Sequence, residues 1–402
     1  MKTVAVIAEY NPFHKGHARL LAAIRRDFGE DSAVIAIMSG NFVQRGTPAA
    51  IGKFDRAKMA VDAGVSLVLE LPFPYSMASA EYFAEAGVSI ANDLGAVDAL
   101  SFGSEAGDVG ALSLTARRMR EPDFKHALSL RLQSKEEKAK GYARVLSETF
   151  AEHFGEDVPV KLDLPNNILA ISYISALQKC ASPILPHTVP RQGTDACGAS
   201  EGVLAGATYV RDLLLSGKTE EALSHMPDET HAHARALKDA GLLPVSPEAL
   251  APMLLSHLRM GATGAPTPAE CGGGVLRLLE KAAREAESLS HLTSLAATKK
   301  YTDARLRRAA LFSYFGVTPA HLKQKPLYSQ VLAMDAKGRA ILADIRKKTS
   351  IPLLTKPADL YKLSREAREQ AERSYRADSV YALLFPTPQR ADIFLRTAPY
   401  RK

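Results

Sequence analysis

Two histidines stand three residues apart near the start of the chain, in the segment Asn11-Pro12-Phe13-His14-Lys15-Gly16-His17. An apolar run from Val4 to Ala8 precedes them, and apolar residues at helical spacing follow. The N-terminus of a helix binds phosphate, because its first backbone N–H groups have no partner and its dipole is positive. Gly16 lets the backbone approach such a ligand closely. The spacing predicts that His14 and His17 donate hydrogen bonds to oxygens that gain charge when a nucleotide α-phosphate is attacked.

A different interpretation of this segment is a helix cap and two surface histidines, which is commoner for an arbitrary pair at this spacing. The apolar strand before the pair, the Asn-Pro turn and the glycine between the histidines favour phosphate chemistry. We therefore expect both imidazoles to face a ligand and not the core. Leaving phosphates need cationic partners, for which Lys53, Arg56 and Arg211 are candidates.

The elements that must position this motif alternate between strand and helix. Short apolar runs that end at Asn, Ser, Pro or Gly predict strands at Val4 to Ala8, Ala33 to Met38, Val65 to Leu71 and Val97 to Phe102. Helical spacing of apolar residues predicts helices at His17 to Arg26, Phe54 to Ala63 and Ser79 to Asn92. This alternation is typical of an α/β fold with a doubly wound parallel sheet, which binds ligands at the carboxyl ends of its strands.

The chain becomes charged and helical after Gly107, which predicts a helical insertion at about residues 108–160. The α/β pattern returns with Ile168 to Leu177 and a strand-like segment from Ile184 to Val189, and Ala205 to Leu215 is typical of a closing helix. Later residues are mostly helical. We therefore expect a nucleotide-binding α/β domain at residues 1–215 and a mainly helical domain at residues 216–402.

The composition is that of an ordinary globular protein, with 402 residues, 46% hydrophobic residues and a net charge of +7. Three cysteines without metal-binding spacing indicate neither a disulfide framework nor a zinc site. No apolar run approaches the roughly 20 residues of a membrane span. We expect a cytoplasmic protein with no membrane partner and no obligate protein partner, and the positive charge favours a polyanionic ligand.

The histidine segment resembles the HxGH signature of the nucleotidyltransferase superfamily, which includes pantetheine-phosphate and nicotinamide-mononucleotide adenylyltransferases. Further segments of the chain closely resemble the bacterial tRNA(Met) cytidine acetate ligases, and they follow the same order. They are Met38-Ser39-Gly40-Asn41-Phe42-Val43-Gln44-Arg45-Gly46, Glu70-Leu71-Pro72, Ser79-Ala80-Glu81, Phe102-Gly103-Ser104-Glu105, Pro165-Asn166-Asn167-Ile168-Leu169, Pro190-Arg191, Lys299-Lys300-Tyr301-Thr302 and Arg305-Leu306-Arg307-Arg308.

The resemblance implies a Rossmann-like nucleotidyltransferase (HUP-type) parallel-sheet domain with a helical insertion, followed by a mainly helical RNA-binding domain. It also implies activation of acetate by ATP as acetyl-adenylate, and transfer of the acetyl group to N4 of the wobble cytidine (C34) of elongator tRNA(Met). Mg²⁺ is expected from ATP chemistry, since no carboxylate pair in the sequence forms a convincing metal site.

The resemblance further implies that His14 and His17 are catalytic. The ATP site would contain Ile7, Ala8, Glu9, Tyr10, Asn11, Pro12, Phe13, His14, Lys15, Gly16, His17, Ala18, Arg19, Leu20, Gly103, either or both of Asn166 and Asn167, and Arg191, together with Thr208 and Arg211. Thr208 and Arg211 resemble the second phosphate motif of the superfamily, in which Gly206 here replaces a serine. After Arg191 the chain departs from the family pattern, because Gly193-Thr194-Asp195-Ala196-Cys197 stands where the family has Gly-Ala-x-Tyr-His/Asn.

A basic segment in the second half contains Lys299, Lys300, Arg305, Arg307 and Arg308. Apolar residues from Leu306 to Phe315 recur at helical spacing, so one face should pack and the other should be positive. A solvated charged face is the ordinary outcome. Beside a nucleotide-binding domain and the family resemblance, binding of tRNA phosphates is the better interpretation. Tyr301 could stack on a base or anchor the helix.

Two other functions are open from the residues alone. An adenylyltransferase that acts on a small phosphorylated acceptor, of the pantetheine-phosphate or nicotinamide-mononucleotide type, would explain the residues up to about Arg211. It would give no role to the later basic segment. A nucleotide-binding RNA chaperone without turnover would explain both halves, and it would release no pyrophosphate from ATP and acetate.

Overall fold

The computed structural model describes the whole chain except residues 135–136, 138–141, 156–159, 192–204, 262–265 and 299. Its centre is a mostly parallel sheet with the strand order β10-β8-β5-β2-β1-β6-β7, in which β9 pairs with the outer side of β8. The parallel strands of the first half are β1 (Thr3–Ala8), β2 (Ala33–Ser39), β5 (Leu67–Leu71), β6 (Ala99–Ser104) and β7 (Leu185–Pro190). The α/β Rossmann-like fold expected from the sequence is thus confirmed.

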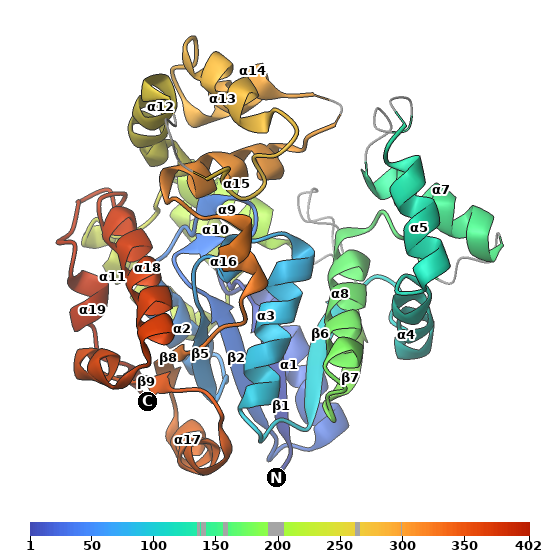
Figure 1. Ribbon diagram of the computed structural model, residues 1–402. Helices are drawn as coiled ribbons and strands as arrows, with labels where there is room; N and C mark the ends of the chain where they lie inside the picture. The colour runs from blue at the N-terminus through green and yellow to red at the C-terminus, as the bar shows by residue number, and fades with distance from the viewer. Residues whose placement is uncertain (135–136, 138–141, 156–159, 192–204, 262–265, 299) are drawn as a thin grey trace.

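Helices cover both faces of the sheet, because alternate residues of each inner strand point to opposite sides. Val4 and Val6 of β1 pack in the same core as α1 (Lys15–Phe28) and α2 (Lys53–Asp62). Ala5 and Ile7 pack with α3 (Ala80–Asp93) and α8 (Pro165–Lys179) on the other face. This layering puts the N-terminal ends of α1 and α3 at the carboxyl edge of the strands (Figure 1).

The segment between β6 and α8 is helical, at the positions where the sequence predicts an insertion. It contains α4 (Val109–Arg118), α5 (Pro122–Arg131) and α7 (Tyr142–Phe154). Figure 1 shows these three helices projecting to one side of the sheet, beyond α8. Phe124 and Phe150 join α5 to α7 with ring centroids 5.6 Å apart, and both belong to the core that α3 and α8 form on this face of the sheet.

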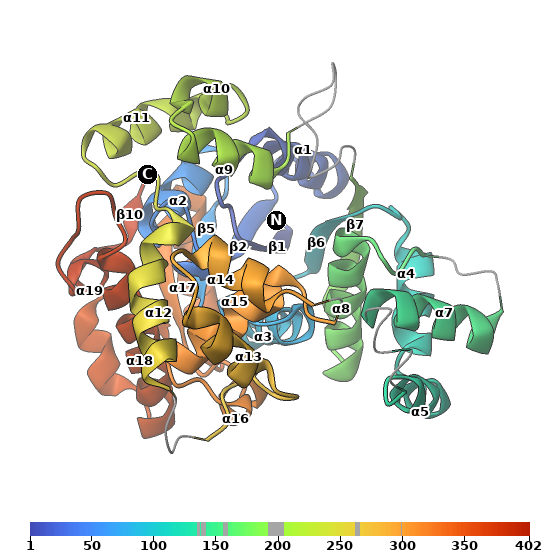
Figure 2. The same ribbon diagram turned by 90° about the horizontal axis from the view of Figure 1, so that it is seen from above.

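The second half begins with a series of helices, of which those from Ala251 to Tyr314 lie over the carboxyl edge of the sheet (Figure 2). The helices of the series are α9 (Ala207–Leu215), α10 (Thr219–Ser224), α11 (His231–Asp239), α12 (Ala251–Met260), α13 (Val275–Ala283), α14 (Leu289–Ala296), α15 (Asp303–Tyr314) and α16 (Pro319–Lys323). Later helices are α17 (Ala336–Lys348), α18 (Arg365–Ala382) and α19 (Ile393–Arg396). This half of the chain is mostly helical, as the sequence predicts.

The domain boundary predicted at residue 215 does not divide the sheet, because strands from both sides of that boundary belong to it. The second half returns to it with β8 (Ser329–Met334), β9 (Leu353–Leu354) and β10 (Tyr400–Arg401), and β8 runs antiparallel to β5. The apolar run in β8 is only the four residues from Val331 to Met334, and so short a run has no periodicity that separates a buried strand from a helix. Pairing with β8 also satisfies the hydrogen-bonding groups along the free side of β5.

A buried cluster of charges joins the two halves of the chain. The Nζ atom of Lys53 in α2 lies 2.9 Å from the carboxylate of Glu70 in β5 and 2.7 Å from that of Asp378 in α18. Asn41 donates to Asp378 at 2.8 Å and accepts from the backbone N–H of Lys53. The two buried carboxylates hold the pKa of Lys53 above its usual value despite burial, so this lysine stays charged.

Two of the three cations suggested for the leaving phosphates are therefore structural. Lys53 is fully buried in this cluster. The guanidinium of Arg56, also fully buried, donates to the backbone oxygens of Glu9, Ile51, Ser39 and Gly40. Sequence spacing after a strand cannot separate a lysine or arginine that faces a ligand from one whose charge is neutralised inside the fold.

Among the helices that the structure describes, none has the length and apolar character to cross a membrane.

Candidate active site

A cavity of about 680 Å³ opens at the carboxyl ends of β1, β6 and β7. Its walls include the N-terminal turns of α1 and α3, the start of α8, the N-terminal turn of α9 and the start of α15. The volume is within the range of sites that enclose a nucleotide-sized ligand. Two of the helices that begin here, α1 and α9, carry the two predicted phosphate motifs, so their positive ends point to one space.

The two histidines are joined to the first turn of α1 by reciprocal hydrogen bonds. The Nδ1 atom of His14 accepts from the backbone N–H of Gly16 at 3.0 Å, and the Nδ1 atom of His17 accepts from the backbone N–H of His14 at 3.1 Å. This is a capping box in which imidazole nitrogens replace the usual oxygens. The rings lie 3.9 Å apart between centroids, and both line the cavity.

These hydrogen bonds decide where each imidazole carries its proton. A backbone N–H can only donate, so each Nδ1 is unprotonated and the proton of the neutral ring is on Nε2. Burial and, to a smaller extent, the charges of Arg191 and Arg211 lower the pKa of His14 to about 3. Burial likewise lowers the pKa of His17 well below its usual value. The site therefore holds two neutral N–H donors at neutral pH.

Gly16 leaves room for the ring of His14. A Cβ atom at this position would lie 2.7 Å from Cε1 of His14, so any larger residue would displace the ring. Tyr10 and Phe13 hold the other ring, with centroids 4.9 Å and 5.3 Å from that of His17. Both aromatic side chains are fully buried. The motif thus packs the histidines rigidly on one side and leaves the cavity on the other.

The second phosphate motif meets the first through Arg211. Its guanidinium donates to the backbone oxygen of Asn11 at 2.8 Å and to Oγ1 of Thr208 at 3.1 Å. Gly206 is the residue before α9, and it lines the cavity together with Thr208. Arg211 is therefore the one of the three suggested cations that lies in the cavity.

The opposite wall is built on Glu105, which follows β6. Its carboxylate accepts from the backbone N–H groups of Asn166 and Asn167 at the start of α8, and from the side chain of Asn166. Asn166 in turn accepts from the guanidinium of Arg191 at 2.7 Å. Asn167 is buried and bonds to backbone groups, and only Asn166 lines the cavity. Of the two asparagines, Asn166 is thus the one placed to meet a ligand.

Comparison with known proteins agrees with this geometry. Residues 1–393 match the family model described as HIGH Nucleotidyl Transferase. The tRNA(Met) cytidine acetate ligase of Caldanaerobacter subterraneus is 36% identical over 398 residues, which cover 96% of each chain. That of Listeria monocytogenes is 34% identical over 394 residues, which cover 96% of this chain and 95% of the relative. This chain belongs to the tRNA(Met) cytidine acetate ligase family.

Solved structures of this ligase family share the whole fold. The crystal structure of Thermotoga maritima TmcAL bound with alpha-thio ATP has a TM-score of 0.90 at 29% sequence identity, and the alignment covers all of both chains. The apo form of the same protein has a TM-score of 0.91. The family resemblance inferred from the residues is therefore confirmed.

Most of the ATP-site residues expected in a member of this ligase family line the cavity. Those that do are Ile7, Ala8, Glu9, Tyr10, Asn11, His14, Gly16, His17, Arg19, Leu20, Gly103, Asn166, Arg191, Thr208 and Arg211. Pro12, Phe13, Lys15, Ala18 and Asn167 do not line it. A contiguous motif includes residues whose side chains turn inward, and Phe13 is one of them. Residues 193–197, where the sequence departs from the family pattern, lie outside the described part of the chain.

Some residues that line the cavity come from outside the two motifs and were not predicted from the sequence. Gln44, Phe83, Tyr173 and Thr302 are among them. Gln44 belongs to one of the segments that resemble the ligases and Phe83 follows another, so these segments were a signal that their surroundings belong to the site. Tyr173 lies eight residues into α8, where only the packing of that helix against the sheet brings it to the cavity.

The basic segment is divided by the structure. Arg308 forms an ion pair with Glu270 at 2.9 Å, donates to the backbone oxygen of Gln44, and lines the ATP cavity. Arg307 donates to the backbone oxygen of Arg45 at 3.1 Å and lines a second pocket. Lys300 and Arg305 flank the ring of Tyr301, each 4.9 Å from its centroid. Lys300, Arg305, Arg307 and Arg308 thus do not form one uniform face, and Lys299 lies outside the described residues.

Tyr301 anchors the start of α15. Its side chain is buried, and its hydroxyl donates to the backbone oxygen of Gly273 at 3.1 Å. Of the two roles considered for Tyr301, this contact and the burial of the ring favour the anchor, because a buried ring has no open face for a base.

Proposed function

We propose that this chain activates acetate with ATP and transfers the acetyl group to N4 of the wobble cytidine of elongator tRNA(Met). The observation that carries the proposal is the pair of neutral imidazoles at the N-terminus of α1, in a chain whose relatives bear the ligase name. The exocyclic amine of cytidine is conjugated with its ring and is a poor nucleophile, so free acetate would not acylate it. An activated acyl donor is required.

In the first step an acetate oxygen attacks the α-phosphorus of ATP, and the bond from that phosphorus to the bridging oxygen of pyrophosphate breaks. Negative charge grows on the phosphate oxygens during the attack. His14 and His17 donate their Nε2 protons as hydrogen bonds to these oxygens and remain neutral throughout. Arg211 and Arg191 supply positive charge on opposite walls of the cavity. The walls also shield the acetyl-adenylate, which is a mixed anhydride, from water.

In the second step the amine nitrogen attacks the acetyl carbon. A C–N bond forms, the bond between the acetyl carbon and the adenylate oxygen breaks, AMP leaves and the nitrogen loses one proton. An anticodon loop presents unpaired bases, so the cytidine reaches the site with little disruption of a duplex.

The Mg²⁺ ion expected with ATP is not assigned to side chains. The described residues contain no group of three or more His, Cys, Asp or Glu side chains that could hold a metal ion. Glu105, which stands behind the cavity wall, already accepts three hydrogen bonds, and Glu9, which lines the cavity, accepts one from the backbone N–H of Gln44. We therefore assign the ion no protein ligand and no step. The compartment that we propose is the cytoplasm, where the tRNA substrate occurs.

The deciding experiment incubates the protein with ATP, labelled acetate and bulk unmodified tRNA, then digests the RNA and identifies any labelled nucleoside. We expect label in N4-acetylcytidine alone. Exchange of labelled pyrophosphate into ATP that depends on acetate, without tRNA, would show independent activation. Exchange supported by phosphopantetheine or nicotinamide mononucleotide instead would replace the proposal with the adenylyltransferase alternative, which the names of the relatives do not favour. The absence of any turnover would favour the RNA chaperone.

A further inference from the structure

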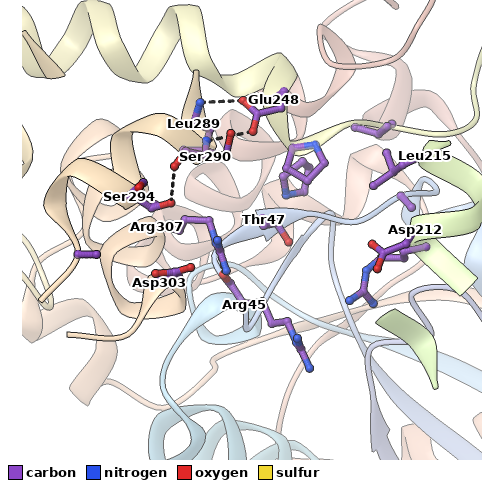
Figure 3. A pocket seen from close by; sticks show the side chains of 17 residues that line it. Arg45, Thr47, Asp212, Leu215, Glu248, Leu289, Ser290, Ser294, Asp303 and Arg307 are labelled. Atoms are coloured by element: carbon purple, nitrogen blue, oxygen red, sulfur yellow. Dashed lines mark hydrogen bonds between the residues drawn. The ribbon is translucent and has the colours of Figure 1, made fainter. Parts of the chain in front are cut away.

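A second pocket of about 560 Å³ adjoins the ATP cavity. It lies between the hairpin formed by β3 (Phe42–Val43) and β4 (Thr47–Pro48), the helix α9, and the helices α14 and α15. Arg45 and Arg211 line both hollows, so a ligand in the second pocket would be separated from the nucleotide by these side chains alone. Figure 3 shows side chains from these elements converging on one space.

The wall formed by α14 is a row of hydroxyl groups. Ser290, Thr293 and Ser294 line the pocket at positions i, i+3 and i+4, which is one face of a helix. Glu248 caps this helix by accepting from the backbone N–H groups of Leu289 and Ser290 at 2.7 Å and 3.0 Å. The helix is thus held firmly. Thr293 is buried and its hydroxyl donates to the backbone oxygen of Ser290, so the exposed hydroxyls of Ser290 and Ser294 are the ones that a polar ligand can reach.

Two arginines of this pocket lack a carboxylate partner within the described residues. Arg45 makes no side-chain hydrogen bond or ion pair there, and Arg307 has only its bond to the backbone oxygen of Arg45. The two guanidinium groups repel each other, and burial lowers the pKa of Arg307. Asp303, in the same pocket, attracts Arg307 from a distance without forming an ion pair. Two neighbouring arginines that form no ion pair with the described residues, although Asp303 and Glu248 lie in the same pocket, keep guanidinium donors for an anion.

A carboxylate faces these cations across the pocket. Asp212 stands on α9 directly after Arg211, and Figure 3 shows it on the side of the pocket opposite α14. Within the described part of the chain its side chain has neither a hydrogen bond nor an ion pair. The exocyclic amine of cytosine is a donor that aspartate recognises. The pocket therefore combines partners for phosphate with a partner for an amine.

We propose that this second pocket, the acceptor pocket, holds the target nucleotide of the RNA, with Arg45 and Arg307 on its flanking phosphates and Asp212 on its exocyclic amine. The inference rests on the proposed function, because it names the place of that reaction's second substrate. A polynucleotide fits better than a free anion, since the hydroxyl row and the carboxylate would have no role toward a lone phosphate.

The two adjoining pockets also fit the steps of the acetyl transfer. The amine nitrogen attacks the acetyl carbon from the acceptor pocket, while the adenylate remains in the ATP cavity on the far side of Arg211. As the C–N bond forms, the proton of the amine passes to the carboxylate of Asp212 and from there to solvent. The bond from the acetyl carbon to the phosphate oxygen breaks, and AMP leaves through the ATP cavity.

The test compares Arg307→Gln, Asp212→Ala and Ser294→Leu with the wild type. Ser294 is exposed, so the leucine fills the pocket without disturbing the core. For each variant the rate of tRNA acetylation is divided by the rate of acetate-dependent pyrophosphate exchange measured without tRNA. We expect this ratio to fall about tenfold or more in all three. For Arg307→Gln the log-log salt slope of tRNA binding should also shrink by about 0.7.

The matched control is Arg346→Gln, an exposed arginine on α17 at the other end of the molecule (Figure 1). Its ratio and salt slope should equal those of the wild type. Wild-type ratios in both Arg307→Gln and Ser294→Leu would overturn the acceptor pocket while leaving the ligase intact. Absence of exchange and acetylation in the wild type would instead refute the proposed function itself.

Discussion

The chemistry that we propose for the site depends on two imidazoles whose protonation is set by the backbone around them. The sequence predicted the residues, the helix start and their ligand-facing position. A helix cap was considered only as the alternative to a ligand-facing role, whereas His14 caps α1 and also lines the cavity, and its near-complete burial was not predicted. The expectation that both rings face a ligand and not the core was therefore incomplete, because one nitrogen of His14 serves the fold while the other is free for the ligand. Spacing alone cannot reveal such a division.

Replacement of His14 by asparagine separates its role as the cap of α1 from its proposed role as a hydrogen-bond donor to the phosphate. An asparagine accepts from the first turn of a helix as an N-cap, so the melting temperature of His14→Asn should stay close to that of the wild type. The N–H donor to the phosphate is lost, and acetate-dependent pyrophosphate exchange should fall by about 10² to 10³. His14→Ala should lose the same activity and about 1 kcal/mol of stability as well. Full exchange activity in His14→Asn would show that this ring has no catalytic role.

Substitution of Gly16 tests whether the position of the ring matters. In Gly16→Ala the new Cβ collides with His14, whereas alanine favours the helix itself by up to about 1 kcal/mol. We expect little change in thermal stability and at least about a tenfold fall in exchange activity. Gly110→Ala, in the first turn of α4 where the nearest group is the carboxylate of Asp108, is the matched control and should retain activity. Equal activities of the two variants would contradict the packing described for the pair.

The lowered pKa of His14 also predicts how stability depends on pH. The unfolded chain protonates this histidine near pH 6.5, while the folded chain does so near pH 3. Between these values the unfolded state binds more protons, so stability falls as pH drops through this window. Denaturant unfolding from pH 7 to pH 4 should show a shallower loss for His14→Asn than for the wild type. Parallel curves would indicate that the ring titrates normally in the fold.

At the scale of elements, the helix α15 belongs to two sites and not to one basic surface. Arg308 faces the ATP cavity and Arg307 faces the acceptor pocket, since consecutive residues of a helix point about 100° apart. The sequence predicted the charges of this helix and its packed face. Leu306, Ala309 and Ala310 are buried in that face. The sequence could not assign each arginine, because Glu270 and the β3–β4 hairpin come from distant segments.

Arginines on α15 should consequently differ in what their loss impairs. Arg308→Ala removes a cation from the ATP cavity and leaves Glu270 without a partner, so we expect a higher KM for ATP in pyrophosphate exchange. Arg305→Ala, which lies beside Tyr301, should leave that KM unchanged. Titrations with ATP at saturating acetate compare the two variants directly. The same KM in both would mean that α15 does not contribute to nucleotide binding.

At the scale of the whole molecule, the ion cluster of Lys53, Glu70 and Asp378 ties residues that are up to 325 positions apart. The sequence indicated Lys53 as a phosphate ligand and gave no role to Asp378. A pattern of single residues cannot show which distant charge will neutralise another. The strands of the second half were missed for a related reason, since they become strands only when β5 is beside them.

Breaking this cluster should destabilise the protein strongly. In Asp378→Asn the charge of Lys53 loses one of its two carboxylates, and the cost should be about 3–5 kcal/mol, as for other buried pairs deprived of a partner. Asp344→Asn on α17, whose carboxylate is exposed, should cost less than about 1 kcal/mol. Urea unfolding of both variants measures the difference. A loss in Asp378→Asn no larger than in the control would show that the cluster contributes little to stability.

The antiparallel pairing of β8 with β5 has a consequence for synthesis of the chain. Translation delivers β5 by residue 71 but its partner only by residue 334, so a long nascent chain exists in which one side of β5 is unpaired. Such an edge can pair with another polypeptide, and large domains with late contacts of this kind are prone to aggregate before they are complete. The ribosome and its chaperones must therefore shelter the first half of this protein until nearly the whole message has been read.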